Sequence, residues 1–154
     1  MSVFLANEQT EAVATTELRG LAEVILREEG YPVDCEVTIL LVSGEEMAGY
    51  NERFLEHEGP TDVLAFPLED LLPGVVPDLD PHGPPLILGD ILIAPSYVRD
   101  QASSMGVGYE DEMALMVTHG ILHLLGYDHE EDRDAERMEQ RERDLLGLIG
   151  RERR

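Results

Sequence analysis

The stretch YEDEMALMVTHGILHLLGYDH, residues 109–129, decides how this chain folds. Apolar residues occupy almost every position in its centre, which indicates a helix that is buried on most of its sides. His119 and His123 are four residues apart, so they lie on one face of that helix. Gly126 can end the helix, and a third histidine, His129, follows three residues later. The stretch therefore predicts a central buried helix that ends in a cluster of three imidazoles.

Three imidazoles in this pattern favour a metal site with three nitrogen ligands and an open fourth position. Catalytic zinc is usually held in this way, with a water molecule in the fourth position, whereas structural zinc usually has four protein ligands. The spacing equals that of the metzincin signature H-E-x-x-H-x-x-G-x-x-H, whose glutamate accepts a proton from the zinc-bound water. Gly120 occupies the glutamate position here. The pattern keeps the metal ligands and lacks the peptidase base.

Length and composition limit the class of protein. The 154 residues fit a single domain, 1–154, with one sizeable core. We find no apolar run long enough to span a bilayer and no basic segment followed by an apolar stretch at the N-terminus. Cys35 is the single cysteine, which excludes an internal disulfide and agrees with a reducing compartment. We therefore expect a cytoplasmic protein with no membrane association.

The charge of the chain is strongly negative. Its 33 acidic residues stand against 11 arginines and no lysine, for a formal net charge of -22. Such a surface repels polyanions, which argues against non-specific nucleic-acid binding and requires any contact with RNA to be local. It would suit a basic partner such as a ribosomal protein, and an acidic surface that serves solubility alone explains it equally well.

Hydrophobic periodicity and turn residues predict the elements in order. Thr16 should cap a first helix, and Ser43 with Glu46 should form a capping box at the second. Pro95 is well placed to open a third helix. We expect helices over about 16–29, 43–55, from 95, 109–125 and 131–149, strands near 35–42, 62–66 and 86–94, and one long loop over about 69–85. This order predicts an α+β fold, with a single small mixed β-sheet covered by helices and a zincin-like metal-binding helix.

Three blocks of sequence resemble one known family. HGILHLLGYDH, residues 119–129, carries in full the signature H-G-x-L-H-L-x-G-Y-D-H of the YbeY endoribonucleases, which are also called rRNA maturation factors. PTDVLAFP, residues 60–67, resembles the family's P-T-D-V-L-S-F-P, and LGDI, residues 88–91, resembles its L-G-D-I. The blocks lie in the family's order, and the resemblance covers most of the chain.

The resemblance implies a single-strand-specific, zinc-dependent endoribonuclease of the bacterial cytoplasm. Its expected roles are maturation of the 3′ end of small-subunit (16S) rRNA and ribosome quality control. It implies one zinc ion held by His119, His123 and His129. The expected partners are single-stranded rRNA and the small ribosomal subunit, together with a basic ribosomal protein or an assembly GTPase.

Two positions depart from the family pattern. Leu55 stands where many members carry an arginine that is expected to bind phosphate, and Ala65 replaces the usual serine. Arg53 is the nearest substitute, but two residues along a helix turn by about 200°, so it should face another way. Either another arginine such as Arg99 approaches the pocket, or RNA affinity comes largely from the metal and a partner.

The proton acceptor is open at this stage because Gly120 has no side chain. Asp128 and Glu130 are nearest in sequence, with Asp128 as the candidate catalytic residue, and attack by the RNA 2′-hydroxyl is an alternative. Asp128 or Asp62 could orient a histidine through its second ring nitrogen. Two other functions compete with the endoribonuclease: a zinc-stabilised, non-catalytic ribosome-assembly factor and a metalloprotease.

Overall fold

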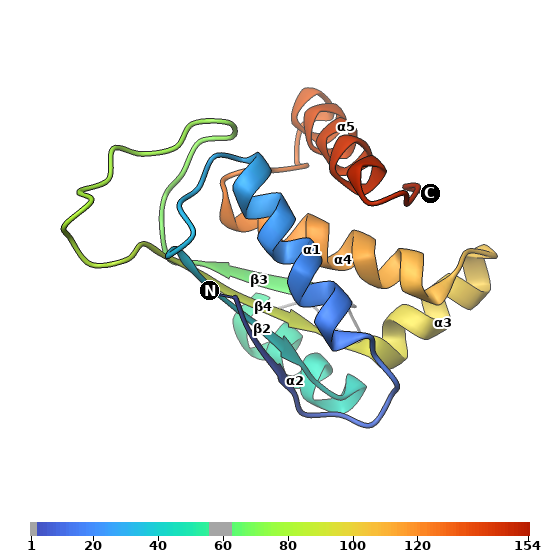
Figure 1. Ribbon diagram of the computed structural model, residues 1–154. Coiled ribbons are helices and arrows are strands. Elements are labelled where there is room, and N and C mark those ends of the chain that lie inside the picture. Colours follow the sequence, from blue (N-terminus) through green and yellow to red (C-terminus); the bar gives the residue numbers. More distant parts are fainter. Residues whose placement is uncertain (1–2, 56–62) are drawn as a thin grey trace.

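The computed structural model, which describes residues 3–55 and 63–154, contains one four-stranded sheet (Figure 1). Its strand order is β1-β2-β4-β3. The first three of these strands are mutually parallel, and β3 runs antiparallel to β4. The expectation of a small mixed sheet is confirmed. The strands are β1 (Val3–Asn7), β2 (Glu36–Leu41), β3 (Val63–Pro67) and β4 (Ile87–Ile93).

The central strands form because their alternate residues are apolar and buried. In β2 the residues Val37, Ile39 and Leu41 are fully buried on one face of the sheet. The sequence analysis assigned no strand to Val3–Asn7. This short segment forms an edge strand because it pairs with β2, and Phe4 remains half exposed there. Its strand conformation depends on pairing with β2, which is distant in the sequence, and so it cannot be predicted from the local sequence.

Helices cover both faces of the sheet. The helices are α1 (Thr15–Glu28), α2 (Gly44–Leu55), α3 (Pro95–Met105), α4 (Tyr109–Leu124) and α5 (Asp132–Leu148). Helices α1 and α4 lie side by side over one face, α5 packs on α4, and α2 lies behind the sheet (Figure 1). On the α2 side a smaller core cluster joins Met47, Leu64 and Leu92. This arrangement confirms the expected α+β class.

The predicted helix starts are mostly confirmed. Ser43 Oγ accepts the Glu46 N–H at 3.1 Å, which is one of the two hydrogen bonds of the predicted capping box, and Pro95 opens α3. The prediction of Thr16 as a cap is wrong, because α1 begins one residue earlier and makes no side-chain capping bond. Thr15 N–H instead donates to the Val13 carbonyl, so the preceding backbone satisfies this helix end.

The predicted long loop is confirmed between β3 and β4, where the only regular pairing is an isolated bridge from Leu72 to Val75. The loop lies against the junction of α4 and α5. Arg137 donates to the Pro73 carbonyl at 3.0 Å. The chain after β3 is thereby fixed close to the end of the histidine-bearing helix. Within the two described ranges, none of the helices is long and apolar enough to cross a membrane.

Candidate metal centre

Helix α4 is the central buried helix, as predicted, and its packing explains the glycine between the first two histidines. It contacts α1, α3, α5, β3 and β4. A Cβ atom at Gly120 would lie 2.9 Å from Ile91 Cγ2, closer than side chains pack. Position 120 therefore faces the sheet, while His119 and His123 keep partial exposure. Glycine is required there for close packing, so a glutamate at that position could not face the histidines without displacing β4.

The turn after α4 brings the third histidine back to the helix. Gly126 has a φ of +98°, and its N–H donates to the His123 carbonyl at 3.1 Å. The next N–H, from Tyr127, donates to the Leu122 carbonyl at 3.0 Å. A Cβ atom at Gly126 would lie 2.1 Å from the Leu71 carbonyl oxygen of the long loop. Only glycine meets both requirements, and the turn it makes delivers His129 to the cluster.

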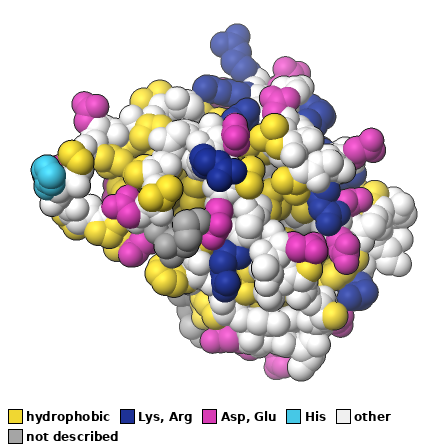
Figure 2. Space-filling view, viewed as in Figure 1, with side chains coloured by type: hydrophobic (Ala, Val, Ile, Leu, Met, Phe, Trp, Pro, Cys, Tyr) yellow, Lys and Arg dark blue, Asp and Glu magenta, His cyan; other side chains and the backbone are white. Residues whose placement is uncertain are grey.

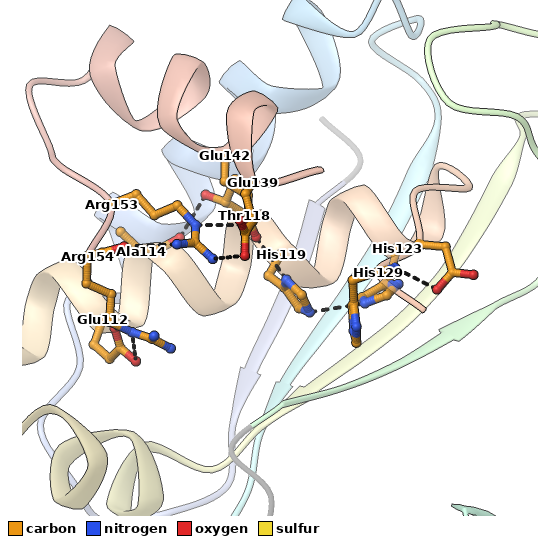
Figure 3. Close-up of polar contacts among 11 residues, drawn as sticks. Glu112, Ala114, Thr118, His119, His123, His129, Glu139, Glu142, Arg153 and Arg154 are labelled. Atoms are coloured by element: carbon orange, nitrogen blue, oxygen red, sulfur yellow. Dashed lines mark hydrogen bonds and ion pairs between the residues drawn. The ribbon is translucent and has the colours of Figure 1, made fainter. Parts of the chain in front are cut away.

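The three histidines converge in the structure (Figure 3). One ring nitrogen from each of His119, His123 and His129 lies within 4.8 Å of the others. His119 Nε2 and His123 Nε2 are 3.0 Å apart. Two nitrogens bound to zinc at 2.0–2.1 Å in tetrahedral geometry would be about 3.3 Å apart, so the cluster needs little adjustment. The three residues could hold a metal ion, and three neutral imidazoles are a donor set that suits zinc.

His119 is oriented by a carboxylate from α5. Its Nδ1 donates to Glu142 Oε2 at 2.8 Å, which leaves Nε2 directed at the other histidines. Glu142 is 1% exposed, and its second oxygen accepts from Arg153 Nε at 2.9 Å. An ionised carboxylate can only accept, so it fixes the proton of His119 on Nδ1. The hydrogen bonds from Arg153 to Glu142 and from His119 to Glu142 thus leave His119 Nε2 available to bind a metal.

The environment of the cluster favours its metal-binding protonation states. Burial, together with the nearby His119 and His129, lowers the pKa of His123 to about 4, although a hydrogen bond to the Tyr127 backbone opposes this. His123 is therefore a neutral imidazole at neutral pH. Burial alone would raise the pKa of Glu142, but its bonds to His119 and Arg153 lower it below the usual value. Glu142 stays ionised beside the histidines.

A second buried carboxylate, Glu112, lies on the histidine-bearing helix α4, about two turns before His119. Glu112 is also 1% exposed, and Arg154 Nε donates to its two oxygens at 2.8 and 3.1 Å. Gln101 of α3 adds a hydrogen bond of 3.3 Å to Glu112 Oε2. A pocket of about 360 Å³ opens between these groups and the histidines. Its polar lining consists of Gln101, His119, His129, Glu139, Glu142, Arg153 and Arg154.

The carboxylate that contacts a histidine was missed by the sequence analysis, which proposed Asp128 or Asp62. Asp128 Oδ1 instead accepts the His129 N–H at 2.7 Å and the Glu130 N–H at 3.3 Å, so it shapes the backbone at the third histidine. Asp62 lies outside the described residues. A signal for Glu142 was present, because it is a single acidic residue within the apolar stripe of α5. The other members of that stripe are Met138, Leu145 and Leu146.

The arginines near the cluster also differ from expectation. Arg99 pairs with Glu11 at 2.9 Å and lies 4.1 Å over the Tyr109 ring, so it does not line the histidine pocket. The side chains of Arg53 and Leu55 fall outside the described part of the chain. Among the described arginines, those that reach the histidine pocket come from residues 153 and 154.

This fold and site define a mixed α+β protein with a three-histidine centre at the end of a buried helix, and three ligands from the described residues are the number that catalytic zinc sites use. Residues 4–150 match the family model described as Endoribonuclease YbeY. The chain therefore belongs to the endoribonuclease YbeY family, and the expected enzyme class is confirmed.

Relatives support this membership over nearly the whole chain. The chain is 45% identical over 139 residues to an endoribonuclease YbeY of Acidothermus cellulolyticus, covering 89% of this chain and 84% of the relative. It is 40% identical over 139 residues to that of Rhodococcus erythropolis, covering 90% and 76%. A solution structure of TM1509 from Thermotoga maritima is similar, with a TM-score of 0.62 and 30% identity over 96% of this chain and 91% of that one.

Proposed function

We propose that this chain is a single-strand-specific, zinc-dependent endoribonuclease. We further propose that it acts in the cytoplasm on the 3′ end of 16S rRNA during small-subunit maturation and ribosome quality control. One observation carries the proposal: three histidine nitrogens converge beside a pocket that also contains two arginines, in a chain of the endoribonuclease YbeY family. We take residues 1–154 as one domain that performs this function.

The residues have distinct roles in the proposed reaction. His119, His123 and His129 would hold one zinc ion, and Glu142 keeps His119 in the required tautomer. When bound, zinc supplies a Lewis acid for a phosphoryl oxygen and lowers the pKa of a water molecule towards ~7. Asp128 is the candidate proton acceptor nearest in sequence, and it is exposed beside His129.

Partners follow from the same proposal and from charge. Single-stranded rRNA on the small ribosomal subunit is the proposed substrate. With a net charge of -22, the chain would suit a basic ribosomal protein as a docking partner, and an assembly GTPase is a further candidate. A metalloprotease is disfavoured, because Gly120 packs against Ile91 and position 120 cannot supply the peptidase base.

The decisive experiment measures cleavage of a single-stranded 16S rRNA 3′ fragment by the wild type and by His119→Ala, with the metal content of both proteins determined. We expect cleavage by the zinc-loaded wild type, and neither zinc nor cleavage in His119→Ala. Equal cleavage by the two proteins would indicate a contaminating nuclease and contradict the proposal. A duplex of the same sequence should remain intact, which tests the strand specificity.

A further inference from the structure

The pocket beside the histidine cluster contains a pair of arginines that the metal site does not explain fully. Its volume of about 360 Å³ is in the range of small-ligand sites. Figure 3 shows Arg153 and Arg154 to one side of His119, with His123 and His129 to the other. On the face seen in Figure 2, arginine side chains gather towards the part of the molecule where α5 lies, with acidic side chains between them.

The charge of this pocket differs from that of the whole protein. Its lining contains the side chains of Glu139 and Glu142 against those of Arg153 and Arg154, so the charges of these four side chains cancel in a chain of net charge -22. A divalent metal ion held by the three histidines would make it positive. The pocket is thus a place where this acidic protein could attract an anion once the metal is bound.

We propose that this pocket binds a backbone phosphate of single-stranded RNA, with Arg154 as its principal donor. The inference rests on the endoribonuclease function proposed above. It assigns the phosphate contact to a segment beyond residues 4–150, the part of the chain that matches the family model.

The hydrogen bonds of the two arginines distinguish their roles. Arg153 is occupied, because Nε donates to Glu142, Nη1 to the Arg154 carbonyl at 2.9 Å, and Nη2 approaches Glu139 at 3.5 Å. Arg154 uses only Nε, on Glu112. Within the described residues, its two terminal nitrogens donate no hydrogen bond to another group. A guanidinium that is fixed at Nε and open at its two terminal nitrogens matches what a phosphate requires.

The position of Arg154 defines which phosphate it can bind. Its partner Glu112 is seven residues before His119, which places both on one face of α4 and about 10 Å apart along the helix axis. A phosphate at Arg154 is therefore a neighbour of the phosphate at the metal, on the same strand. Arg154 would hold the strand in register while the histidine centre acts on the adjacent linkage.

The test measures RNA binding separately from cleavage. Zinc-loaded protein is titrated into a labelled single-stranded 2′-O-methyl oligonucleotide at several salt concentrations, and a gel verifies that the oligonucleotide is intact after each titration. For Arg154→Gln we expect Kd to rise about 5-fold, and the slope of log K against log salt to fall by about 0.7, the value for one phosphate contact on a single strand. Arg154→Lys should retain the slope and lose part of the affinity.

The matched control is Arg143→Gln, which removes the same charge from an exposed position on α5 outside the pocket. It should change Kd by less than about 2-fold. Because Arg154→Gln leaves Glu112 buried without its cation, the double variant Glu112→Gln/Arg154→Gln is measured as well, and it should bind RNA as weakly as Arg154→Gln. Metal content is verified for each protein.

The phosphate site would be overturned if Arg154→Gln and the double variant both bound RNA with the same Kd and the same salt slope as Arg143→Gln. Cleavage of unmodified single-stranded RNA by the wild type would be unaffected by that result. Conversely, a wild type that binds through Arg154 and cuts no RNA would contradict the proposed function and leave the phosphate site standing.

Discussion

Two buried carboxylates lie at the histidine-bearing helix, Glu112 on α4 itself and Glu142 on the neighbouring α5, and they differ in one partner. Glu112 and Glu142 are each 1% exposed, and each is paired with an arginine of the segment after α5. The remaining contact of Glu112 is an amide, Gln101. The remaining contact of Glu142 is His119. Similar ion pairs thus occur twice beside α4, one on Glu112 and one on Glu142, and only the pair of Glu142 reaches the metal centre.

The difference teaches how a structural contact acquires a functional role. A buried carboxylate without a partner would be costly, so both glutamates require their arginines for stability. The other oxygen of Glu142 accepts a hydrogen bond from an imidazole whose second nitrogen faces His123, and by this single contact Glu142 orients a metal ligand. The comparison predicts that stability depends on both glutamates, whereas metal affinity depends on one.

Removing a metal ligand should have the largest effect on zinc affinity, and the effects of replacing the two glutamates are compared with it. In His123→Ala we expect zinc affinity to fall by at least about 1,000-fold, because one of three protein ligands is lost and even a residue that only orients a ligand contributes 10–100-fold. Zinc stoichiometry and cleavage of single-stranded RNA measure the loss. His82→Ala, in the exposed loop, is the control, and it should bind one zinc ion as the wild type does.

Replacing each glutamate by its amide tests the comparison directly. Glu142→Gln should lower zinc affinity by about 10-fold, because an amide holds the His119 N–H less strongly than a carboxylate does. Glu112→Gln should leave zinc affinity unchanged. Both should lower the free energy of unfolding by about 3 kcal/mol, since each leaves an arginine without its buried partner. Competitive zinc titration and urea denaturation measure the two quantities.

Equal zinc affinities for the two amide variants would contradict the conclusion that Glu142 orients a metal ligand. If only Glu142→Gln were destabilised, the Glu112–Arg154 ion pair would not contribute to stability as the Glu142–Arg153 ion pair does. The zinc-free forms are compared in urea, so that loss of the metal does not itself alter stability.

The same comparison shows what the sequence could predict about the site. His119, His123 and Gly126 could be recognised because local geometry fixes them: helical spacing puts the first two on one face, and a glycine permits the turn to His129. The mixed sheet followed from the alternation of strands and helices. These features depend on residues that are close together in the chain.

The residues that orient the histidines, Glu142 and Arg153, could not be predicted, because their position depends on packing between segments that are far apart in the chain. Glu142 is 23 residues from His119, and Arg153 reaches it from beyond the end of α5. Proximity in sequence favoured Asp128, yet its carboxylate bonds backbone N–H groups. Gly120 was recognised correctly as the absence of a base, but its contact with Ile91 required the placement of β4.

A substitution on the side of α4 that faces the sheet should have a smaller effect. It should lower stability and leave metal binding nearly unchanged. Gly120→Ala places a methyl group 2.9 Å from Ile91 Cγ2, and we expect a loss of about 1–3 kcal/mol in the free energy of unfolding. Gly20→Ala, inside α1 with no atom within 4 Å of the new Cβ, should instead stabilise by about 0.5–1 kcal/mol. Urea denaturation of both variants measures the difference, and a Gly120→Ala protein as stable as the wild type would contradict the close packing.

The smallest effect concerns acid stability, where two histidines of one cluster differ in their surroundings. His119 forms a hydrogen bond with a buried carboxylate, whereas His123 is partly buried beside two other imidazoles. The pKa of His123 is about 4 in the folded protein and about 6.5 in the unfolded chain, so the unfolded chain binds more protons between these pH values. The zinc-free protein should therefore lose stability as the pH falls from 6.5 to 4. Urea denaturation of His123→Gln in chelator should show a smaller loss, by about 1 kcal/mol. An identical pH dependence in the two proteins would mean that His123 is as readily protonated in the fold as in the unfolded chain.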